Sequence, residues 1–132
     1  MRAIFDASVA VRALVDERVE ARDWINRLDH GEIDVSVPDL IFAEVGSALA
    51  VHVRLSGLDS AGAVERLEFL RRLPLDVRPL EVIARAAFEL ALDRDLSVYD
   101  ACYALLAEIE QATLVTSDRQ LAAKTLRAEV LP

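Results

Sequence analysis

The amino-acid sequence predicts an α/β protein built on a parallel sheet with helices on both faces. Short apolar segments alternate along the chain with longer segments in which apolar residues recur at helical spacing. Alternation of this kind favours parallel strands joined by crossover helices. Glycine and proline are sparse, with four of each in 132 residues, and no linker or internal repeat interrupts the pattern. We therefore expect a single domain over residues 1–132.

The elements of the first half follow from the spacing of apolar residues. A short continuous apolar run is typical of a buried strand, whereas recurrence at i, i+3, i+4 and i+7 predicts a helix. Strands are expected at Ala3–Asp6 and Asp34–Val37, and helices at Ser8–Val15, Arg18–Leu28, Pro38–Arg54 and Gly62–Leu73. Proline is acceptable in the first turn of the helix that starts near Pro38.

Two of these helices have a defined inward face. Trp24 shares one face of its helix with three other apolar residues, so we expect it in the core rather than in a ligand site. Those three residues are Ala21, Ile25 and Leu28. In the helix Gly62–Leu73 the inward residues are expected to be Val64, Leu67 and Leu70. A loop around Gly57 joins that helix to the one before it.

The second half continues the alternation. Strands are expected at Leu75–Val77, Thr113–Thr116 and, as an edge strand, Ala128–Leu131; helices are expected at Glu81–Asp93, Tyr99–Ile109 and, briefly, from Arg119. Ligands in parallel α/β folds bind beyond the carboxyl ends of the strands. Side chains at those ends are therefore the first candidates for a functional site.

Composition and charge exclude several classes of protein. The chain is 54% hydrophobic and 29% charged, as expected of a folded domain. No apolar run reaches the roughly 18 residues of a membrane helix, and Asp6 interrupts the apolar N-terminus, so no signal peptide is expected. The one cysteine, Cys102, lies in an apolar stretch and allows no internal disulfide, which fits a cytoplasmic location. The net charge of −8 excludes a broad basic surface that coats nucleic acid, but not a small catalytic site for it.

Four acidic residues far apart in the sequence occupy positions that the fold should bring together. Asp6 ends the first strand and Asp118 follows the strand Thr113–Thr116. Asp100 opens a helix, and Glu44 falls within the apolar stripe of its helix, between Ile41 and Ala48. All four positions lie on the same rim of a parallel sheet.

Each acid also has an ordinary explanation when taken alone. Asp6 suits a helix N-cap, Ser97 with Asp100 matches a capping box, and Ser117 or Asp118 should cap the next helix. Glu44 could reach solvent from the edge of its stripe through its flexible stem. The shared rim is what favours a site over four separate caps.

Carboxylates crowded on one rim repel one another unless a cation neutralises them. Hard oxygen ligands without a histidine or thiolate cluster favour Mg²⁺ or Mn²⁺ over zinc. The hypothesis from the residues is therefore a metal-dependent nuclease.

At these acids the chain resembles the PIN-domain ribonucleases, and within them the VapC-type toxins of type II toxin–antitoxin systems. The matching motifs appear in family order and span nearly the whole chain: Ile4-Phe5-Asp6-Ala7-Ser8, Pro38-Asp39-Leu40 leading to Glu44, Leu96-Ser97-Val98-Tyr99-Asp100-Ala101, and Leu114-Val115-Thr116-Ser117-Asp118.

The resemblance implies a three-layer α/β/α sandwich with a central parallel sheet of about five strands. It implies that Asp6, Glu44, Asp100 and Asp118 form the catalytic and metal-binding quartet, with Asp6 and Asp100 as principal ligands. Thr116 would then be a donor that orients a carboxylate. The implied partners are an RNA substrate, a VapB-like antitoxin with a basic C-terminal tail and a second copy of the chain, with no membrane. The negative net charge suits a basic partner.

Two other interpretations remain open from the sequence. An Asp-based phosphoacceptor or phosphatase is the first, but Asp6 is followed by Ala7 and Ser8 where such proteins need a second acid. A catalytically silent PIN-fold interaction module is the second, and the presence of all four acids weighs against it.

Overall fold

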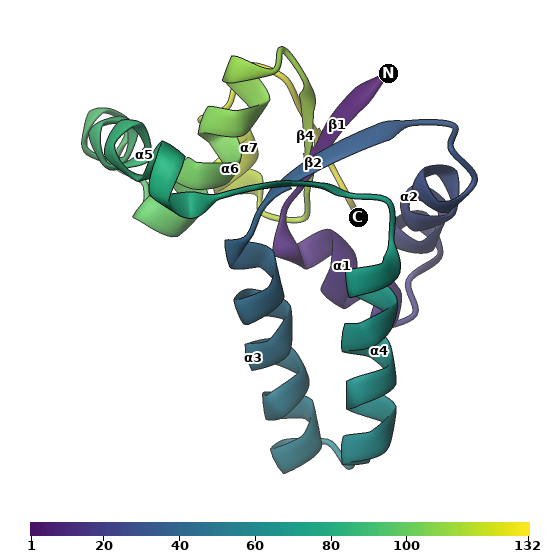
Figure 1. The fold of residues 1–132 in the computed structure, drawn as a ribbon. Coiled ribbons are helices and arrows are strands. Elements are labelled where there is room, and N and C mark those ends of the chain that lie inside the picture. The colour runs from purple at the N-terminus through teal and green to yellow at the C-terminus, as the bar shows by residue number, and fades with distance from the viewer.

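The computed structural model describes residues 1–132 and has a central sheet between two layers of helices (Figure 1). The strands are β1 (Arg2–Phe5), β2 (Asp34–Pro38), β3 (Asp76–Arg78), β4 (Thr113–Thr116) and β5 (Ala128–Val130). The helices are α1 (Ala7–Leu14), α2 (Val19–Asp29), α3 (Leu40–Leu55), α4 (Ser60–Arg72), α5 (Leu80–Arg94), α6 (Val98–Ile109) and α7 (Arg119–Ala123). The predicted fold class, a parallel α/β sandwich of five strands, is confirmed.

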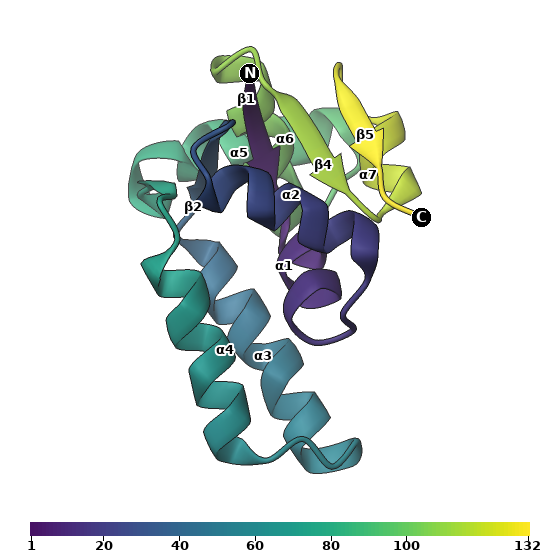
Figure 2. The same ribbon diagram turned by 90° about the vertical axis from the view of Figure 1, so that its right-hand side faces the viewer.

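The five strands pair in the order β3-β2-β1-β4-β5, and every pairing is parallel. β1 lies at the centre, with Ala3 opposite both Val35 of β2 and Thr113 of β4. β5 is an edge strand, as expected, and Figure 2 shows it beside β4 at the margin of the sheet. Because all strands run the same way, the loops after β1 and β4 emerge at one rim.

Each face of the sheet has its own hydrophobic core, because alternate residues of a strand point to opposite faces. Ala3 and Phe5 of β1 pack with residues of α1, α2, α3 and α4 in one core. Ile4, between them, packs with residues of α5, α6 and α7 in the other. Cys102 is buried in this second core, where it behaves as a small apolar side chain.

The predicted element boundaries agree with the structure to within one or two residues. At Pro38 the type of element also differs. Pro38 was expected in the first turn of a helix, but it is the last residue of β2, and α3 begins at Leu40. The chain stays extended there because Pro38 pairs with Arg78 and the Asp39 amide donates to the Arg78 carbonyl oxygen. The β2–β3 pairing thus continues past the proline.

The helices α3 and α4 form a hairpin that projects away from the sheet (Figures 1 and 2). The expectation that Val64 faces inward is wrong, since its side chain is 59% exposed. Leu70, near the base of the same helix, is fully buried, and Leu67 is partly buried. Only the base of the hairpin is covered by the rest of the domain, so helical spacing alone overstates burial at its tip. None of the helices is long and apolar enough to cross a membrane.

A polar network ties α6 to three strands. Ser36, fully buried in β2, donates to the Glu110 carboxylate at 2.7 Å and accepts from Arg2 at 2.6 Å. Glu110 also pairs with Arg78 at 3.1 Å and with Arg2 at 3.3 Å, and its side chain is only 13% exposed. Burial would raise the pKa of Glu110, but the hydrogen bonds from Arg78 and Ser36 and the two positive charges outweigh it and lower the pKa.

We expect Glu110→Gln to lower the free energy of unfolding at neutral pH. A hydrogen bond to a charged group is worth about 1.5–3 kcal/mol, and the partial exposure of both guanidinium groups favours the lower end. Because the folded pKa of Glu110 lies below its ordinary 4.5, its contribution is present above that value and lost as the pH falls through the folded pKa. Urea unfolding of both proteins at neutral pH and at a series of pH values falling below 4.5 measures this difference.

The matched control is Glu89→Gln. Glu89 also pairs with an arginine, Arg85 at 3.1 Å, but the two side chains are 63% and 93% exposed. Exposed pairs of this kind contribute at most about 1 kcal/mol. A Glu110 effect no larger than the Glu89 effect, or one that persists unchanged at low pH, would contradict the role of the network.

Candidate active site at the carboxyl ends of the strands

The four acids singled out in the sequence lie around the carboxyl ends of the central strands. Asp6 directly follows β1 and Asp118 lies two residues beyond β4. Asp100 occupies the first turn of α6, and Glu44 lies in the second turn of α3. Asp6 is buried, Glu44 and Asp100 are partly buried, and Asp118 is exposed. The exposure of the four acids on this rim therefore increases from Asp6, which is buried, to Asp118, which is in solvent.

Asp6 is held by hydrogen bonds to both carboxylate oxygens. Thr116 donates its hydroxyl to Oδ2 at 2.5 Å. The backbone amide of Ser8 donates to Oδ1 at 2.7 Å, and the Ser8 hydroxyl donates to the same oxygen. Since both oxygens have fixed partners, the Asp6 carboxylate has one orientation at the end of β1.

The two hydroxyl groups that hold Asp6 are themselves fixed by the loop after β4. The amide of Asp118 donates to the Thr116 hydroxyl oxygen at 3.0 Å, and the amide of Ser117 donates to the Ser8 hydroxyl oxygen at 2.9 Å. The loops after β1 and β4 are thus joined through side-chain hydroxyls. A shift in one loop would be transmitted to Asp6.

Glu44 is held from a different element. The hydroxyl of Tyr103, on α6, donates to Oε1 of Glu44 at 2.5 Å. Tyr103 is 1% exposed, so its ring is fixed by the core. The sequence left open that Glu44 extends freely into solvent from the edge of its apolar stripe. The hydrogen bond from Tyr103 shows that it does not.

Burial and hydrogen bonding have opposite effects on the pKa values of Asp6 and Glu44. Burial raises the pKa of Asp6 above its ordinary value, and the hydrogen bonds from Ser8 and Thr116 oppose that rise. Burial likewise raises the pKa of Glu44, against the hydrogen bond from Tyr103. In both, desolvation of the charged form is the larger effect.

The charges of the four acids also act on one another. After burial, the charge of Asp118 adds to the raised pKa of Asp6, and the charges of Asp6 and Asp100 add to that of Glu44. The pKa of Asp100 is raised by burial and then by the charges of Asp118 and Asp6. Asp6 and Asp100 are thus each coupled to the other three, while no such coupling joins Glu44 and Asp118.

No positive side chain compensates this set. None of the ion pairs in the structure includes Asp6, Glu44, Asp100 or Asp118. Their hydrogen-bond donors are hydroxyl groups and backbone amides, all neutral. Like charges that are partly desolvated and lack a counter-charge create a strong attraction for a cation.

The donor set fits a hard divalent ion that keeps part of its water. No three acidic, histidine or cysteine side chains stand close enough together to enclose an ion by themselves. Mg²⁺ commonly binds through one or two carboxylates and retains several waters, so a spread set of acids suits it. The absence of nitrogen and sulfur ligands argues against a tetrahedral zinc site.

The ordinary capping explanations hold at the same time. Asp6 is the N-cap of α1, and Asp118 caps α7 by accepting from the Gln120 and Leu121 amides. Ser97 caps α6 by accepting from the Asp100 amide at 3.0 Å. Of the two candidates at the start of α7, Asp118 and not Ser117 is the cap. Capping places these acids on the rim and leaves carboxylate oxygens available, so it does not compete with a site.

Ser8 and Tyr103, which hold Asp6 and Glu44, were not predicted from the sequence. Each stands at a short spacing from a predicted acid, Ser8 two residues after Asp6 and Tyr103 three residues after Asp100 on the same helix. The spacing of Tyr103 was a usable signal, because residues three apart on a helix face the same side. Which acid it contacts could not be read from the sequence, since Glu44 lies 59 residues earlier.

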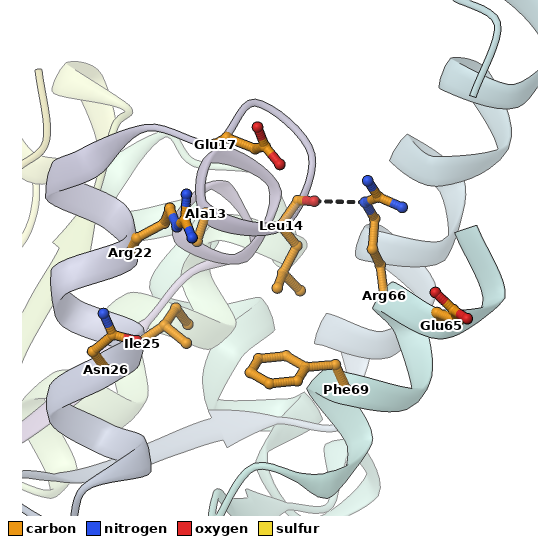
Figure 3. Close-up of a pocket in the computed structure, with 9 residues that line it drawn as sticks. All are labelled: Ala13, Leu14, Glu17, Arg22, Ile25, Asn26, Glu65, Arg66 and Phe69. Atoms are coloured by element: carbon orange, nitrogen blue, oxygen red, sulfur yellow. Dashed lines mark hydrogen bonds between the residues drawn. The ribbon is translucent and has the colours of Figure 1, made fainter. Parts of the chain in front are cut away.

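A cavity formed by helices of the first half of the chain lies elsewhere. A cavity of about 360 Å³ opens between α1, α2 and α4, and Figure 3 shows Arg66 at its side donating to the Leu14 carbonyl oxygen. Ile25 and Phe69 form part of its apolar lining. None of the four acids lines it, so the acidic rim is separate from this cavity.

Comparison with known proteins gives consistent matches over most of the chain. The family model described as the PIN domain matches residues 3–125. Ribonuclease VapC3 of Pyrobaculum aerophilum is 34% identical over 94% of this chain and 95% of its own length. Exonuclease VapC9 of the same organism is 38% identical over 69% of this chain and 67% of its own length.

Solved structures match as well. The structure of PAE2754 from Pyrobaculum aerophilum has a TM-score of 0.77 and 29% identity, covering 98% of this chain and 92% of that one. VapBC2 from Rickettsia felis, solved with a DNA fragment from its promoter, has a TM-score of 0.72 and covers 98% of both chains. At 15% identity, the second match bears on the fold alone.

Proposed function

The chain belongs to the PIN domain family, and from that premise we propose that it is a Mg²⁺- or Mn²⁺-dependent endoribonuclease, the toxin of a toxin–antitoxin pair. The observation that carries the proposal is the set of four acids at the carboxyl ends of the strands, none of which has a positively charged partner. Asp118 is exposed at this rim, and acids that reach solvent can meet a polymer, whereas an enclosed cavity would suit a small molecule.

Asp6 and Asp100 are the residues best placed to hold an ion, because each is coupled to all the other acids. Glu44 and Asp118 would complete its surroundings, directly or through water. A divalent ion bound there supplies a more acidic water and neutralises charge on a phosphodiester.

The chain's own groups prepare the site for that chemistry. Thr116 and Ser8 fix the Asp6 carboxylate, so its position costs no reorganisation when substrate arrives. Neutral donors leave the negative charge of the acids intact for an ion.

The names of the relatives support the substrate and the partner. Relatives named VapC ribonuclease at above 30% identity support RNA as the substrate. A toxin of this kind is proposed to pair with a small antitoxin whose basic tail approaches the acidic rim, and the net charge of −8 favours such a partner. Association of two copies of the chain is proposed on the family resemblance.

Removal of divalent ions is expected to abolish cleavage. Purified protein, free of antitoxin, is incubated with structured RNAs in Mg²⁺ or Mn²⁺, with and without excess EDTA. Cleavage should disappear with EDTA and return when Mg²⁺ or Mn²⁺ is restored in excess, because no protein group can replace the ion's charge. Cleavage at full rate in EDTA would overturn the metal dependence.

A circular RNA tests whether cleavage is internal. The relatives carry both ribonuclease and exonuclease names, and only an endonuclease can open a substrate without ends. Linear products from the circle are the expected result. Degradation of linear RNA alone, with the circle intact, would replace the endonuclease assignment by an exonuclease.

A further inference from the structure

The hydrogen bond between Tyr103 and Glu44 joins two elements that each carry an acid of the rim. Tyr103 lies one turn after Asp100 on α6, and Glu44 lies on α3, so the bond spans 59 residues of sequence. Tyr103 is fully buried, and Glu44 is its hydrogen-bond acceptor. A buried tyrosine hydroxyl needs a partner, but a backbone carbonyl would serve that need as well.

Glu44 has a reason to move that the hydrogen bond opposes. Its side chain is flexible and only partly buried, and the charges of Asp6 and Asp100 repel it. Without a donor, the carboxylate would reduce that repulsion by turning toward solvent. A tyrosine whose ring is packed in the core loses little conformational entropy in holding it.

Tyr103 holds the carboxylate without neutralising it. It binds only Oε1, which leaves Oε2 without a protein donor. Asp6 is treated in the same way, since Ser8 and Thr116 hold it with neutral hydroxyl groups. A lysine or arginine in place of Tyr103 would fix Glu44 but compete with a bound cation.

We propose that Tyr103 is a positioning residue that holds Glu44 on the acidic rim. The inference rests on the proposed function, because Tyr103 would keep the Glu44 carboxylate within reach of the metal and the scissile phosphate. It acts through Glu44 and does not itself contact substrate.

Tyr103→Phe removes only the hydroxyl and is the first test. We expect kcat for RNA cleavage and the affinity for Mn²⁺ each to fall by about tenfold to a hundredfold, as for other groups that orient a metal ligand, with KM for RNA unchanged. Mn²⁺ affinity is measured by calorimetry on metal-free protein. Tyr99→Phe, on the same helix and 62% exposed, is the matched control and should change neither quantity.

A double-mutant cycle separates positioning from a structural role. If Tyr103 acts through Glu44, Tyr103→Phe should have no further effect on kcat or Mn²⁺ affinity in a Glu44→Gln background. An equal loss in both backgrounds would overturn the proposal, as would unchanged kcat and Mn²⁺ affinity in the single variant. A wild-type protein that cleaves no RNA counts against the proposed function alone, and the Mn²⁺ titrations then decide the role of Tyr103.

A second measurement needs no substitution at Tyr103. The chain has two tyrosines, so ¹³C-tyrosine labelling gives two ring Cζ signals, which Tyr99→Phe assigns. Mg²⁺ should shift the Tyr103 signal, because an ion that draws on Glu44 weakens the hydrogen bond from the phenol. A Tyr103 signal that does not respond at saturating Mg²⁺ would show that Glu44 and its donor lie outside the metal site.

Discussion

Replacing Asp6 with asparagine is expected to reduce RNA cleavage by about a thousandfold, since a divalent ion supplies several kcal/mol of transition-state stabilisation. Asp6 is the most buried of the four acids and is coupled to each of the others. Asparagine keeps the size of the side chain but removes its charge. Single-turnover cleavage of one structured RNA, with excess protein and saturating Mg²⁺, measures the loss.

The same substitution should leave the fold intact. Burial raises the pKa of Asp6, which means that the folded state disfavours its charged form. Asparagine avoids that cost and can still accept from the Ser8 amide, but its NH2 group cannot accept from the buried Thr116 hydroxyl. The two effects oppose each other, so the free energy of unfolding should change little. A large loss of stability would instead mean that Asp6 serves the fold.

Asp59→Asn is the matched control for Asp6→Asn. Asp59 is also an aspartate N-cap, and it accepts from the Gly62 amide at 2.7 Å at the start of α4. It lies at the tip of the α3–α4 hairpin, away from the rim (Figure 2). RNA cleavage by this variant should equal that of the wild type. A comparable loss in both variants would contradict a specific role for Asp6.

The identity and contacts of residue 8 favour the nuclease interpretation over the phosphatase interpretation. A phosphatase of the type considered from the sequence needs a second aspartate there, and the chain has Ser8. Ser8 donates to Asp6 and accepts from the Ser117 amide, so its role is to orient the first acid rather than to add another. The match to the PIN domain over residues 3–125 agrees with that local geometry.

The sequence predicted the fold and the rim because both depend on local rules. Strand and helix periods placed Asp6 and Asp118 after parallel strands, and the topology then fixed their common side. The prediction failed where the burial or the partner of a side chain depends on segments distant in the sequence. Val64 is one case, because little of the rest of the chain covers it at the hairpin tip. Tyr103 belongs to the same class, because its partner Glu44 comes from α3, a helix 59 residues earlier whose core residues lie on the other face of the sheet.

Trp24→Ala is expected to have the largest effect on stability, because it removes the largest side chain beneath the strand that carries Asp6. Trp24 is 7% exposed and contacts Phe5 edge-to-face, with ring centroids 6.0 Å apart and planes at 81°. The Arg27 guanidinium lies 4.3 Å from its ring centroid. Truncation of a buried aromatic costs about 3–5 kcal/mol, a large part of the roughly 5–15 kcal/mol that keeps a domain folded.

Urea unfolding followed by far-UV circular dichroism measures this loss, because Trp24 is the only tryptophan and the variant has no tryptophan fluorescence. Phe88→Ala, an aromatic truncation at a side chain that is 53% exposed, is the control and should cost far less. A loss no larger than that of Phe88→Ala would mean that Trp24 contributes little to the core. Because Trp24 supports β1 through Phe5 and is not among the hydrogen-bond donors to the acids, RNA cleavage by the folded fraction of the variant should approach the wild-type rate. Asp6→Asn, in contrast, should retain the fold and lose the activity.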